Sequence, residues 1–436
     1  MKTLFENAWI LTMDEELGEI RGGWLLTDGK RIAALGGGAF EGECDARIDA
    51  RGGILLPGFV NLHCHASMVP FRTMGDDCRD RLRRFLFPLE NEAMTRNLAY
   101  LGAKYAVAEM LLSGCTAFVD MYYFEDAVAD ACREAGMLGY LGETVISQPT
   151  CDSPQPDGGL DLTRRLFDAC RGDEWVRPIV APHGTTTCTE QTLRRCAELA
   201  REHQALLTLH VSEMDYEMQF FAERGQTPLE YLDGLGAVDE RLLAAHCIHL
   251  TPGDIELLRA RGASVAHCIG SNTKAGKGVA PVRALAEAGV TVGLGTDGPS
   301  SGNTLSPFDQ MRLFADFHKT VNRDRSLFTA KEIVALATRE GARALHADGE
   351  FGRLRPGLRA DLTLVSLDAA NMFPVYNPYS ALVYSANASN VDTVMTAGEL
   401  RVRHGRLCQM ELESLRAALA AEMKPFVKAA ARYPEV

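Results

Sequence analysis

The sequence predicts an α/β protein, a (β/α)8 barrel of the TIM type with a small β-sandwich domain built from the N- and C-terminal segments. Apolar strands alternate with helical stretches through the middle of the chain, and they recur about every 33 residues, the size of a βα repeat. Short alternating strands lie on both sides of this region. We therefore expect residues 1–57 and 350–410 to form the composite sandwich, 58–349 the barrel, and 411–436 a C-terminal helix.

The N-terminal segment has the pattern of a small β domain. Alternating apolar and polar residues run through 8–12, 23–27 and 31–35, and Asp28-Gly29 between the last two stretches is a hairpin signal. Short strands joined by tight turns are therefore expected before residue 57.

The middle of the chain predicts eight barrel strands. Parallel strands of a closed barrel end at the same rim, where active sites of this fold lie. An open doubly wound sheet is the alternative, but no Gly-x-Gly-x-x-Gly follows the first strand to support it. The predicted strand ends are rich in His, Asp and Glu: His65, Asp120, Thr144, His183, Glu213, His246, His267 and Asp297.

The strand pattern returns near the C-terminus, at residues 357–365 and 391–398, and these strands could pair with the N-terminal ones. Residues 411–432 are rich in alanine and have helical spacing, which predicts the terminal helix.

The composition narrows the choice of partners and compartment. The net charge of −13 opposes binding to a phosphate backbone, and no basic stripe overrides it, so we expect no nucleic-acid partner. The first residues lack the apolar core of a signal peptide, and no apolar run reaches membrane-spanning length. The twelve cysteines are scattered, with no Cys-x-x-Cys pair. These features favour a cytoplasmic protein in a reducing environment.

Four residues at the predicted strand ends suit a metal ion. His63 and His65 end the first barrel strand one residue apart, so their side chains point to the same side. In a barrel, His210 and Asp297 face the same axis at the same rim. Three imidazoles and one carboxylate suit a divalent ion such as Zn²⁺ and leave a position for water, whose pKa such an ion lowers to about 7. Iron is the alternative, because imidazole suits both metals.

Three residues could move protons beside this site. Glu213 follows His210 by three residues and could protonate a ring nitrogen of a substrate, His246 could orient the attacking water, and Asp297 could take its proton. Each residue by itself could equally be a core or loop residue. The convergence of all of them on barrel strand ends favours catalysis.

These motifs resemble the metal-dependent amidohydrolase superfamily, in particular the branch of methylthioadenosine/S-adenosylhomocysteine deaminases and their triazine-hydrolase relatives. The resemblance covers nearly the whole chain and extends to residues 360–362. It is carried by Pro57-Gly58-Phe59-Val60-Asn61-Leu62-His63-Cys64-His65, His210-Val211-Ser212-Glu213, Ala245-His246-Cys247-Ile248-His249-Leu250, Val265-Ala266-His267-Cys268-Ile269-Gly270-Ser271-Asn272-Thr273-Lys274 and Gly293-Leu294-Gly295-Thr296-Asp297-Gly298.

The resemblance implies one metal ion, held by His63, His65, His210 and Asp297. Binuclear members carry a bridging lysine or glutamate on the fourth strand, whereas the fourth strand here ends in His183. The same resemblance gives Glu213 the role of proton shuttle, places His246 beside the attacking water, and suggests a homo-oligomer such as a dimer. His249 and His267 are expected to have supporting or structural roles.

The substrate-binding residues that the resemblance implies are Glu90, which would accept hydrogen bonds from both ribose hydroxyls, and His183. The alternative for Glu90 is an exposed carboxylate at a helix start. Where relatives place arginines for the carboxylate of S-adenosylhomocysteine, this chain has Glu143 and Leu160. Glu143 would repel that carboxylate, so a neutral nucleoside is the expected substrate.

The segment before Glu90 also departs from the family. It lacks the tryptophan expected over the base, for which Phe85 or Phe87 could substitute. Its arginines, at positions 79, 81, 83 and 84, could meet an anionic substrate or form a solvated helix face.

The expected activity is metal-dependent hydrolytic deamination of an aminated purine, a neutral adenine nucleoside such as methylthioadenosine, adenosine or deoxyadenosine. An aminohydrolase of guanine, a pterin or a triazine is the alternative enzyme, and an inactive structural barrel is the alternative from another class, although no ligand or shuttle residue is missing. The signature of cytidine-deaminase zinc enzymes is absent. Gly276-Lys277-Gly278 lacks the rest of a phosphate-binding loop.

Overall fold

The computed structural model describes residues 1–433 and divides into two compact units. The first comprises Met1–Asn61, Ala108–Ala117 and Ser306–Met410; the second, Leu62–Val107, Phe118–Leu305 and Glu411 onward. These units divide the chain differently from the predicted limits at residues 58 and 349, and those limits stay a prediction. No helix within the described residues combines the length and apolarity needed to cross a membrane.

Strands from both ends of the chain make one nine-stranded sheet in the first unit. As predicted, β2 and β3 form a hairpin whose register pairs Asp28 with Arg31, and the C-terminal strands join the N-terminal ones where Leu362 pairs with Pro57. The strands are β1 (Lys2–Leu11), β2 (Glu19–Asp28), β3 (Arg31–Gly37), β4 (Ala46–Asp49), β5 (Ile54–Pro57), β15 (Leu362–Val365), β16 (Val391–Thr396), β17 (Glu399–Arg403) and β18 (Arg406–Leu407).

This sheet bends so that its two ends share one core. Ile32 donates a backbone hydrogen bond to Leu358, which ties β3 to the segment before β15. Buried side chains from both termini, among them Phe5, Leu25 and Met395, pack in the same cluster. Alternation puts one face of each strand into this core, which is why these segments have a period of two in the sequence. The helices of this unit are α11 (Pro307–Asn322), α12 (Ala330–Leu336), α13 (Arg339–Ala344) and α14 (Pro378–Tyr384).

The parallel barrel strands occur where they were predicted, each ending within a few residues of the expected position. The fourth is interrupted and appears as two short pieces, β9 and β10. The strands are β6 (Phe59–Cys64), β7 (Cys115–Tyr122), β8 (Leu138–Val145), β9 (Val176–Pro178), β10 (Ala181–Pro182), β11 (Leu207–Val211), β12 (Leu242–His246), β13 (Ser264–His267) and β14 (Thr291–Leu294).

Backbone hydrogen bonds connect these strands into a closed ring. One sheet has the order β10-β8-β7-β6 and another the order β11-β12-β13-β14. Parallel bridges, one of them between Gly184 and His210, link the first sheet to β11. Where the segment after β14 meets β6, the amides of Thr296 and Asp297 donate to the carbonyl of His63 over 3.2 and 3.0 Å. The strand ends therefore share one rim, as the predicted barrel requires.

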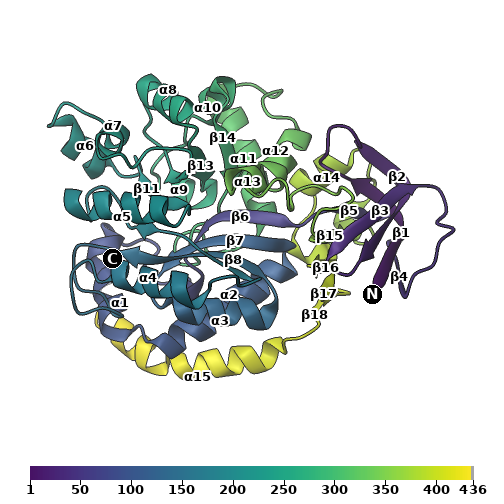
Figure 1. The fold of residues 1–436 in the computed structure, drawn as a ribbon, viewed down its shortest axis with the longest axis horizontal. Helices are drawn as coiled ribbons and strands as arrows, with labels where there is room; N and C mark the ends of the chain where they lie inside the picture. The colour runs from purple at the N-terminus through teal and green to yellow at the C-terminus, as the bar shows by residue number, and fades with distance from the viewer. Residues whose placement is uncertain (434–436) are drawn as a thin grey trace. The chain divides into compact units, whose positions relative to one another are not determined.

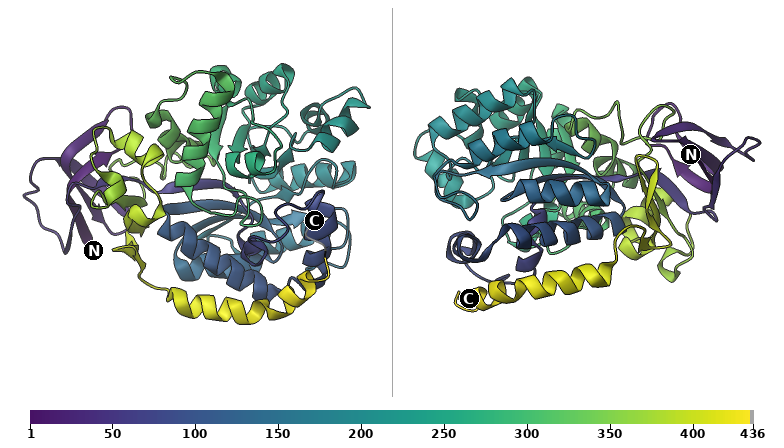
Figure 2. Two further views of the ribbon diagram at one scale, coloured as in Figure 1. Left: turned by 180° about the vertical axis from the view of Figure 1, so that it is seen from behind. Right: turned by 60° about the horizontal axis from the view of Figure 1, so that its bottom comes forward.

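Helices follow the strands and cover the barrel. Figure 1 shows β7 and β8 side by side with α3 and α4 beneath them. Figure 2 shows α15 in yellow running past α1. Phe426 of α15 packs edge-on against Phe71, the last residue of the helical turn Ala66–Phe71. The last residues of the predicted C-terminal segment, 434–436, lie outside the described residues. The helices are α1 (Phe87–Ala93), α2 (Arg96–Leu112), α3 (Glu125–Ala135), α4 (Gly159–Ala169), α5 (Glu190–Glu202), α6 (Asp215–Ala222), α7 (Pro228–Gly234), α8 (Pro252–Arg261), α9 (Ile269–Lys274), α10 (Val282–Ala288) and α15 (Leu412–Ala430), with short helical turns at Ala66–Phe71 and Leu82–Leu86.

Candidate active site

The structure brings together the four predicted metal-binding side chains at the barrel rim. Donor atoms of His63, His65 and Asp297 lie within 4.8 Å of one another, and so do those of His63, His210 and His246. The shortest ion-pair distance among them is 3.3 Å, from His65 Nε2 to Asp297 Oδ1. Both groups contain His63, so the two sets of donors adjoin each other.

Backbone carbonyls orient two of these imidazoles. His65 Nδ1 lies 2.6 Å from the Met121 carbonyl, and His210 Nδ1 lies 2.6 Å from the His183 carbonyl. Because a carbonyl oxygen only accepts, both Nδ1 atoms carry the hydrogen, and Nε2 keeps its lone pair. This arrangement is typical of metal-ligating histidines.

The protonation states also fit a divalent cation. Burial lowers the pKa of both His63 and His210 well below that of an ordinary histidine, so these rings are neutral at pH 7. Burial alone would raise the pKa of Asp297, but His65, His246 and the Gly298 amide lower it to about 2. Neutral imidazoles and an ionised carboxylate are the forms that bind a metal without first releasing protons.

The backbone beside this cluster adopts an uncommon conformation. His246 and Asp297 have φ angles of 69° and 60°, in the left-handed region that favours glycine. Such positions cost about 1–3 kcal/mol each and occur often at functional sites. Here they place two polar side chains at the ends of β12 and β14.

Glu213 lies two residues past β11, beside the cluster. Its Oε1 accepts a hydrogen bond from Lys277 Nζ over 2.5 Å and lies 3.8 Å from His246 Nε2. Burial would raise the pKa of Glu213, but His246, Lys277 and His210 together lower it far below that of an ordinary glutamate. Glu213 is therefore ionised and can accept a proton.

His246 is held by a partner that the sequence analysis did not assign. Its Nδ1 lies 2.8 Å from Asn272 Oδ1, and both residues are buried. Lys277 was considered only as part of an incomplete phosphate-binding motif. Its position between two glycines gave no sign that its side chain would reach Glu213.

Glu90 lies on the first turn of α1 and is buried rather than solvent-exposed. Tyr122, at the end of β7, donates a hydrogen bond to Glu90 Oε1 over 2.7 Å. The Tyr122 ring also lies 6.3 Å from the His65 ring, which connects Glu90 to the cluster. Burial raises the pKa of Glu90 to about 7, against the opposing effect of the Tyr122 bond. The sequence analysis assigned no role to Tyr122.

His183 lies between the cluster and a pocket of about 760 Å³. Its ring is 4.9 Å from that of His210 and 5.5 Å from that of Phe87. Thr187 Oγ1 lies 2.9 Å from His183 Nδ1, and both Phe87 and Thr187 line the pocket. Of the two candidates to cover a base, Phe87 is therefore the one beside the site, whereas Phe85 is fully buried.

Glu143 occupies a buried group of acidic side chains near the ends of β7 and β8. Its Oε2 accepts a hydrogen bond from the Glu125 amide over 3.0 Å. Burial, together with Asp152 and Glu125, raises the pKa of Glu143 well above that of an ordinary glutamate. This shift disfavours the charged form of Glu143, and the charge repulsion expected from it stays a prediction. Leu160 is also buried.

The arginines before Glu90 have different surroundings. Arg81 donates to the carbonyls of Ser300 and Met74, while the Arg83 guanidinium lies 4.4 Å from the Tyr216 ring centre and lines the pocket beside His183. Arg79, Arg83 and Arg84 are exposed. Three of the four arginines therefore face solvent, and Arg81 is the exception.

The two remaining predicted histidines lie near the same strand ends, and their supporting roles stay a prediction. His249 Nε2 lies 3.6 Å from Asp215 Oδ1, and the backbone carbonyl of His267 accepts from the Gly295 amide over 3.1 Å.

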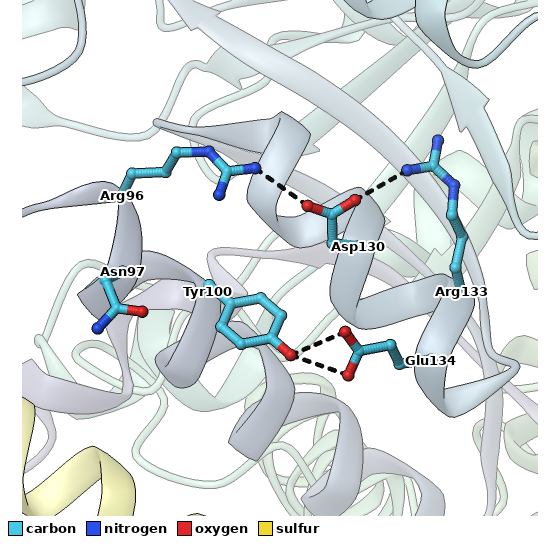
Figure 3. Close-up of a pocket in the computed structure, with 6 residues that line it drawn as sticks. All are labelled: Arg96, Asn97, Tyr100, Asp130, Arg133 and Glu134. Atoms are coloured by element: carbon cyan, nitrogen blue, oxygen red, sulfur yellow. Dashed lines mark hydrogen bonds and ion pairs between the residues drawn. The ribbon is translucent and has the colours of Figure 1, made fainter.

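A second pocket, of about 550 Å³, lies between α2 and α3, away from these residues (Figure 3). Its charged groups pair with one another: Asp130 bonds both Arg96 and Arg133 at 3.0 Å, and Tyr100 donates to Glu134. These pairs leave this pocket without an obvious reactive group.

Comparisons with known proteins identify the family of the chain. The model of the amidohydrolase family matches residues 54–401. A 5-methylthioadenosine/S-adenosylhomocysteine deaminase of Syntrophus aciditrophicus is 39% identical over 93% of this chain and 93% of that protein. A 5'-deoxyadenosine deaminase of Methanothermobacter thermautotrophicus is 36% identical over 96% and 99%. The crystal structure of an adenosine deaminase from Xanthomonas campestris with bound zinc is 30% identical, with a TM-score of 0.94 over 98% of both chains.

These similarities confirm the predicted family, the barrel with its β-rich domain, and the enzyme class of a hydrolytic deaminase. The His-rich cluster and the zinc-bound neighbour support a divalent metal ion. The chain belongs to the amidohydrolase family.

Proposed function

We propose that this protein is a metal-dependent deaminase that replaces the amino group of a neutral adenine nucleoside with oxygen and releases ammonia. The observation that carries the proposal is that the proposed metal ligands, His63, His65, His210 and Asp297, meet Glu213 and His246 at one rim of the barrel. Glu90 and His183 lie beside the cluster, where a sugar and a base could bind. The names of the relatives support methylthioadenosine, 5'-deoxyadenosine and adenosine as candidate substrates, and one of these names also includes S-adenosylhomocysteine.

We infer that one zinc ion is held by His63, His65, His210 and Asp297. The two groups of donor atoms share His63, which favours a single ion, and the zinc of the Xanthomonas campestris structure supports the metal identity. Zinc bound there would supply Lewis-acid chemistry and lower the pKa of water.

The residues of the chain supply the proton transfers. Glu213 starts ionised, so it can take one proton of the attacking water and deliver it to the ring nitrogen next to the carbon that bears the amine. His246, with its ring fixed by Asn272, orients this water, and Asp297 accepts its second proton and passes it to the departing amine. The balance is that of hydrolysis: one water is consumed, its two protons end on the ring nitrogen and on ammonia, and the carbon–nitrogen bond is replaced by a carbon–oxygen bond.

The sugar contact is assigned to Glu90. An ionised carboxylate can accept from both hydroxyls of a vicinal diol, and the buried position of Glu90 beside Tyr122 would strengthen these bonds. His183, whose pKa burial lowers to about 4, is neutral and can bond a ring nitrogen or a hydroxyl. The role proposed for Glu143 in substrate choice rests on the absence of an arginine at its position.

The testing experiment measures ammonia release by metal-quantified protein on methylthioadenosine, adenosine, deoxyadenosine, S-adenosylhomocysteine, guanine, a pterin and an aminotriazine. We expect a clear preference for a neutral adenine nucleoside, with kcat/KM on S-adenosylhomocysteine lower by about tenfold or more, because neither Glu143 nor Leu160 can pair with its carboxylate. Comparable efficiencies on the two kinds of nucleoside would contradict the selectivity. Bound metal without nucleoside turnover would move the activity to another heterocycle.

The cytoplasmic location and the homo-oligomer stay predictions from the sequence. Light scattering of the purified protein measures its oligomeric state directly.

A further inference from the structure

Lys277 contacts the proposed proton shuttle, yet the proposed function gives it no role. It lies in the loop between α9 and α10, and its ammonium group donates to Glu213 Oε1 over 2.5 Å. The side chains of Lys277 and Glu213 are 23% and 14% exposed. Solvent therefore screens this pair less than it screens an ion pair on the open surface.

The loop that carries Lys277 is anchored to the same site. The Lys277 amide donates to the Asn272 carbonyl over 2.9 Å, and the side chain of Asn272 holds His246. Gly276 and Gly278 flank the lysine with φ angles of 66° and 120°, which residues with side chains rarely adopt. One short segment, residues 272–278, thus contacts both proposed proton-handling residues.

The backbone and the side chain of Glu213 are held separately. The Glu213 amide donates to Glu217 Oε2 over 2.9 Å, and Glu217 also accepts a hydrogen bond from Thr185. This anchor fixes the backbone but leaves the carboxylate free to turn. Lys277 is the donor that holds the carboxylate, 3.8 Å from His246 Nε2.

We propose that Lys277 is a positioning residue that holds the Glu213 carboxylate at the angle required for proton exchange with the substrate ring. The inference rests on the proposed function, because it assumes that Glu213 moves the proton. Without Lys277, the carboxylate can rotate toward His246, and misplacement by about 1 Å can cost a large part of a catalytic rate.

A neighbouring lysine provides a matched control. Lys274 lies three residues earlier and donates to Asp76 over 2.7 Å and to Asn303. It is exposed, and it directs its charge to these partners rather than to Glu213. Lys274→Met therefore removes one positive charge from the same segment without removing the bond to Glu213.

The experiment compares wild type, Lys277→Met, Lys277→Arg and Lys274→Met by kcat, KM, metal content and Tm on the best substrate of the panel. For Lys277→Met we expect kcat to fall by about tenfold or more, with KM within about threefold and the metal retained. Lys277→Arg should recover part of the loss, because a guanidinium also donates to a carboxylate. Lys274→Met should match wild type, and Lys277→Met within twofold of wild type would overturn the inference.

Two further measurements separate this inference from the proposed function. If the lysine acts through Glu213, the double variant Glu213→Gln/Lys277→Met should have the same kcat as Glu213→Gln alone. A kcat lowered by the full effect of both substitutions would show that Lys277 does not act through Glu213. A crystal structure of Lys277→Met should show the Glu213 carboxylate displaced, with the Asn272 contact to His246 kept. An unmoved carboxylate would refute the positioning role, whatever the activity of the wild type. A wild type that is inactive on every nucleoside would refute the proposed function.

Discussion

Tyr122 and Glu90 form a buried hydrogen bond of 2.7 Å in which the phenol donates to the carboxyl group. Burial raises the pKa of Glu90 to about 7, so this residue changes charge near neutral pH. Above that pH it is ionised and can accept from both sugar hydroxyls; below it, a proton occupies one oxygen. We therefore expect KM for methylthioadenosine to rise as the pH falls below 7. Initial rates between about pH 5.5 and 9 measure this, and a KM that is constant over the range would contradict it.

The Tyr122→Phe variant tests the cause of this pH dependence. The tyrosine bond lowers the pKa of Glu90, so its removal should raise that pKa further. The pH at which KM begins to rise should then move upward. The neighbouring Tyr123, whose ring centre lies 4.9 Å from that of Tyr122, provides the comparison as Tyr123→Phe. Equal pH profiles for the wild type and Tyr122→Phe would rule out this role.

Replacement of Glu90 by Gln separates nucleosides from free bases. The amide cannot accept from two hydroxyls as an ionised carboxylate does, so KM for a nucleoside should increase by about 10- to 100-fold. KM for a free base should hardly change, because a free base has no sugar. The control is Glu92→Gln on the same helix, where the carboxylate bonds Tyr433 over 2.6 Å. An equal effect of Glu90→Gln on both substrate types would show that Glu90 does not contact the sugar.

Glu213→Gln should lower kcat by a factor of about 10² to 10⁴, because glutamine cannot carry the proton. KM and the metal content should stay close to wild type, since Glu213 is not among the proposed ligands. Asp215→Asn is the matched control, because its side chain is 99% exposed two residues away. A Glu213→Gln enzyme with nearly full kcat would assign the proton transfer to another group.

Removal of the metal should abolish activity and lower the Tm. An ion that binds the folded state in excess over its Kd stabilises it by a few kcal/mol, so chelation should lower the Tm by about 2 °C or more. His210→Ala should reduce the bound metal measured by mass spectrometry, whereas His404→Ala, at an exposed position, should not. Full metal content in His210→Ala would remove that residue from the ligand set, and a count of two ions per wild-type chain would contradict the single-ion proposal.

Local patterns in the sequence determined the barrel and the chemistry at its rim. Strands and helices differ in their apolar period, and a closed parallel barrel collects its strand ends at one rim, so His63, His65, His210 and Asp297 could be placed together before any contact was known. The pairing of the terminal strands followed in the same way, and Leu362 does pair with Pro57.

Only the tertiary structure decided which side chains surround these residues. Lys277 contacts Glu213, which lies 64 positions away in the chain, and Tyr122 contacts Glu90, which lies 32 positions away. No local sequence pattern predicts either contact. The environment of Glu143 is also decided by folding: its own burial, together with nearby Asp152 and Glu125, raises its pKa well above that of an ordinary glutamate. The physical reason is that the charge state and orientation of a side chain depend on desolvation and on partners that folding brings together. The positions of strands along the chain, in contrast, follow from the local pattern of apolar residues.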